Sequence, residues 1–138
     1  MKVLKIFITF WIPTAIVLLL SIFSTGQTVA TVPNIIPTVS IIQRNLIVML
    51  MIWSSGFLNK YIPYWIFGFN ALFFSVILAL NSNAMNIVEV MKYGVIEVLS
   101  FSIALSIAGT IKIKYLTCAT ILVIAAAFLE NLVMRGVL

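Results

Sequence analysis

Three ionisable side chains lie within long apolar stretches of this sequence and are the first candidates for chemistry. Arg44, Glu97 and Glu130 are each flanked on both sides by mostly apolar residues. An ionisable group inside a membrane costs at least about 2.5–3.5 kcal/mol, so such groups normally face the interior of a helix bundle and pair with one another. We therefore expect Arg44 to form an ion pair with Glu97, with Glu130 or with both.

Three amide side chains, those of Asn45, Asn70 and Asn131, are expected to add hydrogen bonds to the same buried polar cluster, because a buried amide needs partners. The simplest role of this cluster is a structural ion pair that fixes helix register. Two alternatives are a relay for protons or a substrate, and a docking site for a partner helix. A Glu97→Gln variant separates these roles, since a structural pair predicts reduced assembly, whereas a relay predicts normal assembly with lost transport.

Most enzymatic chemistry lacks its usual residues here. The chain has no histidine and one cysteine, Cys118, so zinc and haem ligation and Ser-His or Cys-His catalysis lack their ligands and bases. Two glutamates can in principle do acid–base work, but no nucleophile motif or paired base accompanies them. We therefore expect no catalytic residue, no metal, no cofactor and no enzymatic activity. Cys118 stands among apolar residues and is expected to pack as a small hydrophobe.

The composition indicates an integral membrane protein. Of the 138 residues, 64% are hydrophobic and 8% are charged, whereas about a quarter of the residues of a soluble domain are charged. The basic residues are dispersed between apolar stretches and are not gathered into a stripe, which argues against nucleic-acid binding.

Five apolar stretches are long enough at helical rise to cross a hydrocarbon core of about 30 Å. They predict an all-α, polytopic transmembrane helical bundle that forms a single domain over residues 1–138, with helices at about 6–24, 39–58, 62–80, 93–111 and 115–134. The polar segment 81–86 is expected to form a turn, followed by a short interfacial segment with Glu89 and Lys92. A signal peptide cleaved near Thr28-Val29-Ala30 is the alternative for the first stretch, although its apolar length exceeds the usual range of about 7–15 residues.

The positive-inside rule gives these spans a direction. With a cytoplasmic N-terminus and five crossings, the inner side receives five of the eight basic residues, Lys2, Lys5, Lys60, Lys112 and Lys114. The outer side receives the other basic residues and all the acids, namely Arg44, Lys92, Arg135, Glu89, Glu97 and Glu130. Arg44, Glu97 and Glu130 then lie at a common depth of roughly 6–9 Å below the outer boundary, which brings them within reach of one another if their helices adjoin.

Small residues mark the helix faces that are expected to pack against other helices, because they let backbones approach closely in lipid. They recur at helical spacing in the stretches 93–111 and 115–134, and are Gly94, Ala104, Ala108, Ser102, Ser106, Gly109, Ala119 and Ala126. The glutamates of these two stretches share a side with some of them. Both are therefore expected at helix contacts and not at lipid contacts.

Several short motifs together resemble the stage II sporulation protein M family. They are Arg44-Asn45, Ser55-Gly56-Phe57, Gly68-Phe69-Asn70-Ala71, Lys92-Tyr93-Gly94-Val95-Ile96-Glu97-Val98, Gly109 and Ala126-Ala127-Phe128-Leu129-Glu130. The family typically has an Asn-Gly pair in place of Asn70-Ala71. It also has a Pro-His-Gly-x-x-Glu motif, of which this chain keeps Gly94 and Glu97 and lacks the Pro and the His.

The resemblance implies a non-enzymatic, multi-pass protein of the bacterial cell membrane that works in a complex. The sporulation member is a scaffold for cell-wall hydrolases during engulfment, and relatives in bacteriocin gene clusters resemble production, export or immunity factors. We expect an accessory or scaffold subunit whose partners are membrane lipid and other membrane proteins, such as an ABC exporter or a second copy of itself. The alternative is a transport or channel subunit that uses the intramembrane Arg and Glu residues.

Overall fold

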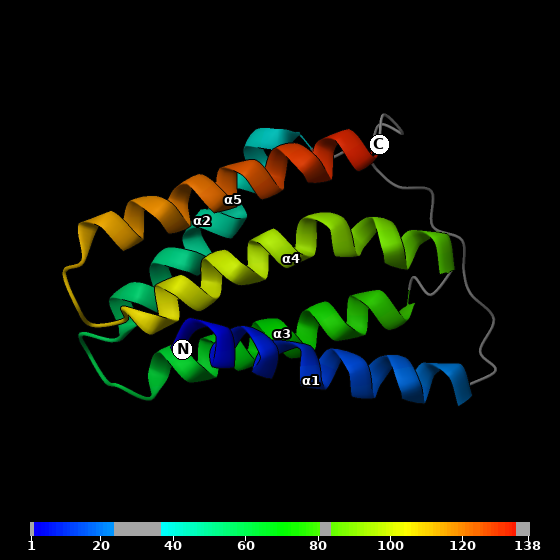
Figure 1. Ribbon diagram of the computed structural model, residues 1–138, viewed down its shortest axis with the longest axis horizontal. Helices are drawn as coiled ribbons and strands as arrows, with labels where there is room; N and C mark the ends of the chain where they lie inside the picture. Colours follow the sequence, from blue (N-terminus) through cyan, green and yellow to red (C-terminus); the bar gives the residue numbers. More distant parts are fainter. Residues whose placement is uncertain (1, 24–36, 81–83, 135–138) are drawn as a thin grey trace.

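The computed structural model describes residues 2–23, 37–80 and 84–134. These residues form five α-helices and no β-strand, as the apolar stretches predict. The helices are α1 (Lys2–Phe23), α2 (Thr38–Ser55), α3 (Ile62–Leu80), α4 (Ala84–Ser106) and α5 (Ile113–Met134). They lie roughly along one long axis, and the α2–α3 and α4–α5 connections meet at the same end of the bundle (Figure 1). Residues 28–30, the alternative cleavage site, and Arg135 lie outside the described residues.

Helix α4 is the centre of the bundle, because it contacts each of the other four helices. By contrast, α3 and α5 make no contact with each other in the described part of the chain. The side of α4 that faces its neighbours carries small residues, and Gly94, Ser100, Ser102 and Ala104 are all buried. Small side chains let several backbones approach one helix at once, so the composition of α4 suits its central position.

The predicted start of this helix near residue 93 is wrong, because α4 begins at Ala84. Residues 84–92, which were expected to form part of a turn and an interfacial stretch, are helical. Apolar length determines where a helix can enter lipid, but it does not determine where the helix begins. No glycine or proline lies between Ala84 and Tyr93 to stop the helix, so the helix continues through the polar residues.

The other end of α4 also differs from its predicted position near residue 111, since the helix ends at Ser106. Gly109 adopts a φ of +71°, a left-handed conformation that glycine takes without steric cost. Its N–H donates a hydrogen bond to the carbonyl oxygen of Trp53 at 3.1 Å. The indole Nε1–H of Trp53 in turn donates to the carbonyl oxygen of Thr110 at 2.9 Å. The turn that ends α4 is therefore held against the last turns of α2.

Aromatic rings join α1 to α3 and α3 to α4. The rings of Phe10 and Phe67 meet edge to face with centroids 5.2 Å apart, a favoured geometry for aromatic pairs. Phe74 packs against Phe10 and Trp11 and also lies directly over Gly94, where a Cβ atom would come within 2.9 Å of its ring. The missing side chain of Gly94 therefore makes room for the Phe74 ring.

Two helical stretches of the described chain, Thr38–Ser55 and Ile113–Val133, are long and apolar enough to cross a membrane. A third, Ile62–Ile77, is apolar but shorter. Core helices of soluble proteins pass the same test of length and composition. The two helices therefore support a membrane location, and the larger number of spans remains a proposal.

The expectation that Cys118 is buried is wrong, because its side chain is exposed on α5. Residues on every side of α5 are apolar, so the sequence around Cys118 does not distinguish an inward face from an outward one. Ala119, the next residue, is the one that packs inward and is fully buried.

Gly56 and Gly109 provide the first testable prediction. A Cβ atom on Gly56 would overlap the backbone of Ala108 and Gly109, and Gly109 is hydrogen-bonded to Trp53. Gly56→Ala is therefore expected to lower the free energy of unfolding by about 1–3 kcal/mol, the usual cost of overpacking. The measurement is the thermal midpoint of the detergent-solubilised protein.

Gly68→Ala is the matched control, because a Cβ atom at Gly68 would have no other atom within 4 Å. It is expected to leave the midpoint unchanged or to raise it slightly, since alanine is the better helix former. Equal effects of the two substitutions would contradict the close approach of α2 to the α4–α5 turn.

Candidate functional site: a buried polar cluster at one end of the bundle

An ion pair connects α2 to α5. The Nη2 atom of Arg44 lies 4.0 Å from Oε1 of Glu130. The two partners differ in exposure, since the Arg44 side chain is 63% exposed and that of Glu130 only 11%. The carboxylate is thus held inside the bundle, while the guanidinium reaches it from the surface and keeps most of its N–H donors facing outward. Of the two partners considered for Arg44, the structure places Glu130 in contact.

The next residue along each of these helices is a buried asparagine. Asn45 is 3% exposed and Asn131 is 7% exposed. The Nδ2 atom of each has no hydrogen-bond partner in the described part of the chain. Leaving such a donor unpaired costs about 1–3 kcal/mol, so each of these two amides lowers the stability of the bundle.

Glu97 adds a second carboxylate from α4. Its side chain is half-buried, and its charge lies close enough to Glu130 and Arg44 to interact with both. Three helices therefore contribute one ionisable group each to the same region. Two carboxylates and one guanidinium carry a formal charge of −1 when all three are ionised.

Asn70 lies half-buried on α3. Helix α3 packs against α2 and α4 but makes no contact with the described part of α5, which carries Glu130 and Asn131. The structure therefore brings Arg44 and Glu130 together, beside Asn45 and Asn131 and with Glu97 near them, and places Asn70 on a helix that does not adjoin α5.

The spacing of apolar residues explains why the cluster faces inward. On α2, Ile41, Asn45, Met49 and Ile52 follow one another at three- and four-residue intervals and are all buried. Residues at this spacing share one face of a helix, so the apolar stripe carries Asn45 inward with it.

The stripe on α5 follows the same spacing and carries Glu130. Its inward-facing residues are Ala119, Val123 and Ala126, which are almost completely buried. The hydroxyl of Ser100 on α4 donates to the carbonyl oxygen of Ala119 at 2.8 Å, which fixes the register of α4 against α5. Glu130 therefore lies on the face of α5 that the bundle covers.

The other residues that were predicted to pack between helices make different kinds of contact. Ser102 is buried and donates to the carbonyl oxygen of Val98 in its own helix, and Ser106 does the same to Ile103. Ala108 and Gly109 lie at the contact with Gly56. In the described residues no group of three or more His, Cys, Asp or Glu side chains could hold a metal ion.

A second polar site lies at the opposite end of the bundle, where Lys2, Lys60, Tyr61 and Tyr64 line a pocket. Lys60, Tyr61 and Tyr64 are close in sequence. They lie in the short α2–α3 loop or just after it, so the sequence alone indicates that they are near one another. Lys2 begins α1 and is far from them in sequence. The positive-inside rule places it on the same side as Lys60, but no local pattern predicts that the two line one pocket.

No protein-family model, curated protein or solved structure matches this chain. The resemblance to the stage II sporulation protein M family therefore stands on the motifs themselves.

The two unpaired amides provide the second prediction. Asn131→Leu replaces the amide with an apolar group of similar size and removes the buried donor, so the thermal midpoint in detergent is expected to rise or stay unchanged. Ser100→Ala is the control, because it removes a bond that is made and should lower stability by about 0.6 kcal/mol. A midpoint that falls further for Asn131→Leu than for Ser100→Ala would show that the amide has a partner in the folded protein.

Proposed function

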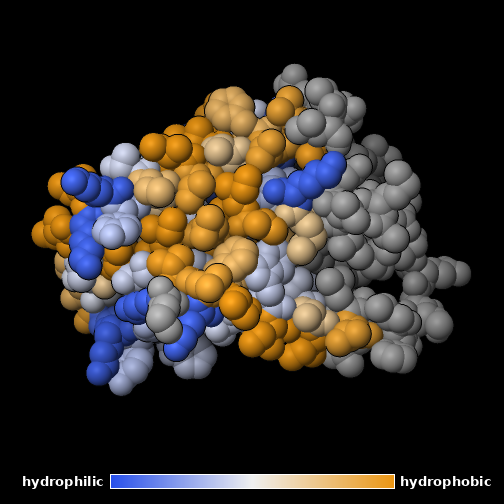
Figure 2. All heavy atoms as spheres, in the orientation of Figure 1, coloured by the Kyte–Doolittle hydropathy of each residue, from blue (hydrophilic) through white to orange (hydrophobic). Residues whose placement is uncertain are grey.

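We propose that this chain is a multi-pass membrane protein with about five spans and a cytoplasmic N-terminus, and that it serves as a non-enzymatic accessory or scaffold subunit of a bacterial membrane complex. The observation that carries the membrane assignment is the outer surface, where large apolar side chains are exposed on every helix. Examples, one from each helix in chain order, are Ile8, Ile47, Phe73, Val95 and Ile121. The apolar surface extends over the middle of the bundle (Figure 2), which is costly in water and favourable in lipid.

The distribution of charge supports the orientation. Lys2 and Lys5 at the start of α1, Lys60 between α2 and α3, and Lys112 and Lys114 around the α4–α5 turn all belong to one end of the bundle. Figure 2 shows hydrophilic residues gathered at that end, beside the apolar middle. A cluster of Lys residues at one end fits the cytoplasmic side of a membrane protein.

The polar cluster supports a role in a complex. The guanidinium of Arg44, whose side chain is 63% exposed, is a group that a helix of another protein can satisfy. Polar side chains join helices in membranes through such bonds. The motif resemblance adds the setting, which we propose to be bacteriocin production, export or immunity, with an ABC exporter or a second copy of the chain as partner. A scaffold for cell-wall hydrolases in sporulation is the other setting that the resemblance allows.

A transport or channel role is the second candidate, and the observation that favours it is the grouping of Glu97 and Glu130 beside Arg44 on three helices. Intramembrane carboxylates of this kind occur in proton and ion pathways. The accessory role uses the exposed guanidinium of Arg44 as a contact for a partner, and is therefore preferred.

Cysteine accessibility tests the topology and is the third prediction. In a Cys118→Ser background, Ser40→Cys near the start of α2 should react with a membrane-impermeant maleimide in intact cells. Lys60→Cys and Lys112→Cys should react only in inverted vesicles, because both belong to the opposite end of the bundle. Labelling of Ser40→Cys and Lys60→Cys from the same side would mean that α2 does not cross the membrane.

Purification from native membranes tests the function and is the fourth prediction. The tagged chain should bring down a stoichiometric partner, and Glu130→Gln should lower its recovery several-fold, since the variant weakens the ion pair that orients Arg44. Lys114→Gln, at the other end of the bundle, is the control and should leave recovery unchanged. A clean, active monomer would overturn the accessory role, whereas normal recovery with lost transport in Glu97→Gln would favour the relay.

A further inference from the structure

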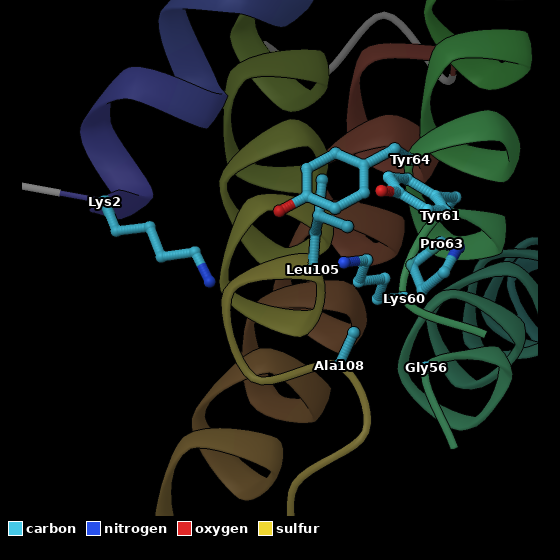
Figure 3. Close-up of a pocket in the computed structure, with 8 residues that line it drawn as sticks. All are labelled: Lys2, Gly56, Lys60, Tyr61, Pro63, Tyr64, Leu105 and Ala108. Carbon is cyan, nitrogen blue, oxygen red and sulfur yellow. The ribbon is translucent and has the colours of Figure 1, made fainter. Parts of the chain in front are cut away.

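A pocket of about 490 Å³ opens at the basic end of the bundle. It lies where the start of α1, the α2–α3 loop, the start of α3 and the end of α4 come together (Figure 3). Pockets that hold small ligands commonly range over about 300–1,000 Å³, so the space is large enough for a lipid headgroup or a small metabolite.

Two ammonium groups reach into this pocket from different elements. Figure 3 shows the side chains of Lys2 and Lys60 extending towards the space between them. The Nζ of Lys2 donates to the carbonyl oxygen of Ser106, the last residue of α4, at 3.4 Å, where the end of a helix favours a cation. The Nζ of Lys60 lies 5.0 Å from the centre of the Tyr61 ring. Each ammonium is thus held in place by one contact and keeps further N–H donors for a ligand.

Two phenol groups complete the polar lining. Tyr61 and Tyr64 are both exposed, and Figure 3 shows the hydroxyl of Tyr64 pointing into the space between the two lysines. The remaining lining residues are small or apolar, and are Gly56, Pro63, Leu105 and Ala108. The pocket therefore has a positively charged rim with hydroxyl donors and an apolar floor.

The charge of this rim is not neutralised by the pocket itself. No carboxylate is among the residues that line it. The described carboxylates, Glu97 and Glu130, belong to the cluster with Arg44 at the other end of the bundle. A cationic concavity without a counter-charge attracts an anion, and its apolar floor favours an anion attached to an apolar group.

We propose that this pocket binds a phosphate ester, with the phosphate of an anionic phospholipid headgroup as its occupant. Donors from four side chains converge on the space, and the several oxygens of a phosphate accept more hydrogen bonds than the two of a carboxylate. Lysine is a common phosphate ligand, and basic pockets between helices on the cytoplasmic side of a membrane bind anionic headgroups. The lipid as source rests on the proposed membrane function, whereas the phosphate chemistry rests on the pocket alone.

The test is a thermal titration of the full chain in neutral detergent with three probes, namely short-chain phosphatidylglycerol, short-chain phosphatidylcholine and glycerol 3-phosphate. Phosphatidylglycerol should raise the midpoint saturably, and phosphatidylcholine should not. In Lys2→Gln/Lys60→Gln, the apparent affinity should fall about tenfold or more, because two charge-assisted contacts are lost. Lys112→Gln/Lys114→Gln removes the same charge from the same end outside the pocket, and should keep the wild-type affinity.

Tyr64→Phe is a milder variant that keeps both lysines and the ring, so it guards against misfolding of the double variant. It should weaken phosphatidylglycerol binding several-fold with an unchanged midpoint in the absence of ligand. Equal loss in the two double variants would overturn the proposal, since it would mean a diffuse field and not a site. Equal saturation by glycerol 3-phosphate would support a phosphate site with a soluble ester as its source.

Extraction of native membranes with alkaline carbonate distinguishes failure of the pocket from failure of the membrane assignment. A chain that stays in the membrane but shows no saturable response to any probe overturns the pocket alone. A chain released by carbonate overturns the membrane assignment and the lipid source, and saturation by glycerol 3-phosphate would still support the phosphate site.

Discussion

Four helices approach the backbone of α4 from different sides, and this crowding is the constraint on which the rest of the bundle depends. Several helices can surround one helix closely only where its side chains are small. Gly94 makes room for the ring of Phe74, and Ser100 reaches the backbone of α5. Gly109, just beyond the end of α4, lets the end of α2 approach its backbone. Because α2 and α5 are both fixed against α4, Arg44 and Glu130 are brought within reach of each other.

Buried hydroxyl groups of the bundle form hydrogen bonds, whereas two buried amide groups have an unpaired donor. The hydroxyls of Ser75 and Ser102 donate to carbonyl oxygens of their own helices, and that of Thr14 hydrogen-bonds Ser75 across the α1–α3 contact at 3.0 Å. A short hydroxyl can always turn to a carbonyl of the preceding turn. The longer amides of Asn45 and Asn131 have no such partner for their Nδ2 atoms. Both Nδ2 atoms are buried, so their cost is part of the folding free energy of the bundle itself.

The two ends of the bundle carry different chemistry. One end holds carboxylates under partial cover beside the exposed guanidinium of Arg44, while the other carries lysines around an open pocket. An apolar surface lies between them. If the apolar surface lies in lipid, both polar regions fall near the membrane boundaries, where polar groups can reach water or headgroups. The end with the carboxylates then suits protein contact, and the end with the lysines suits an anionic ligand.

The sequence by itself determined the number of helices and most of their positions, because long apolar stretches must be helical to satisfy their own backbone in a core. The predicted range 62–80 matches α3 at both ends, since Pro63 and the polar segment after Leu80 bound it. The sequence also identified Arg44 and Glu130 as groups that need partners.

Only the tertiary structure decided which groups meet. Helix adjacency selected Glu130 as the contact of Arg44 and placed Asn70 on a helix that does not adjoin α5. Cys118 faces outward because a helix that is apolar on every side gives no sign of its buried face. The pocket of Lys2 and Lys60 joins segments far apart in the chain. Local patterns report the period and the length of a helix, whereas contacts between distant segments depend on how all the helices pack together.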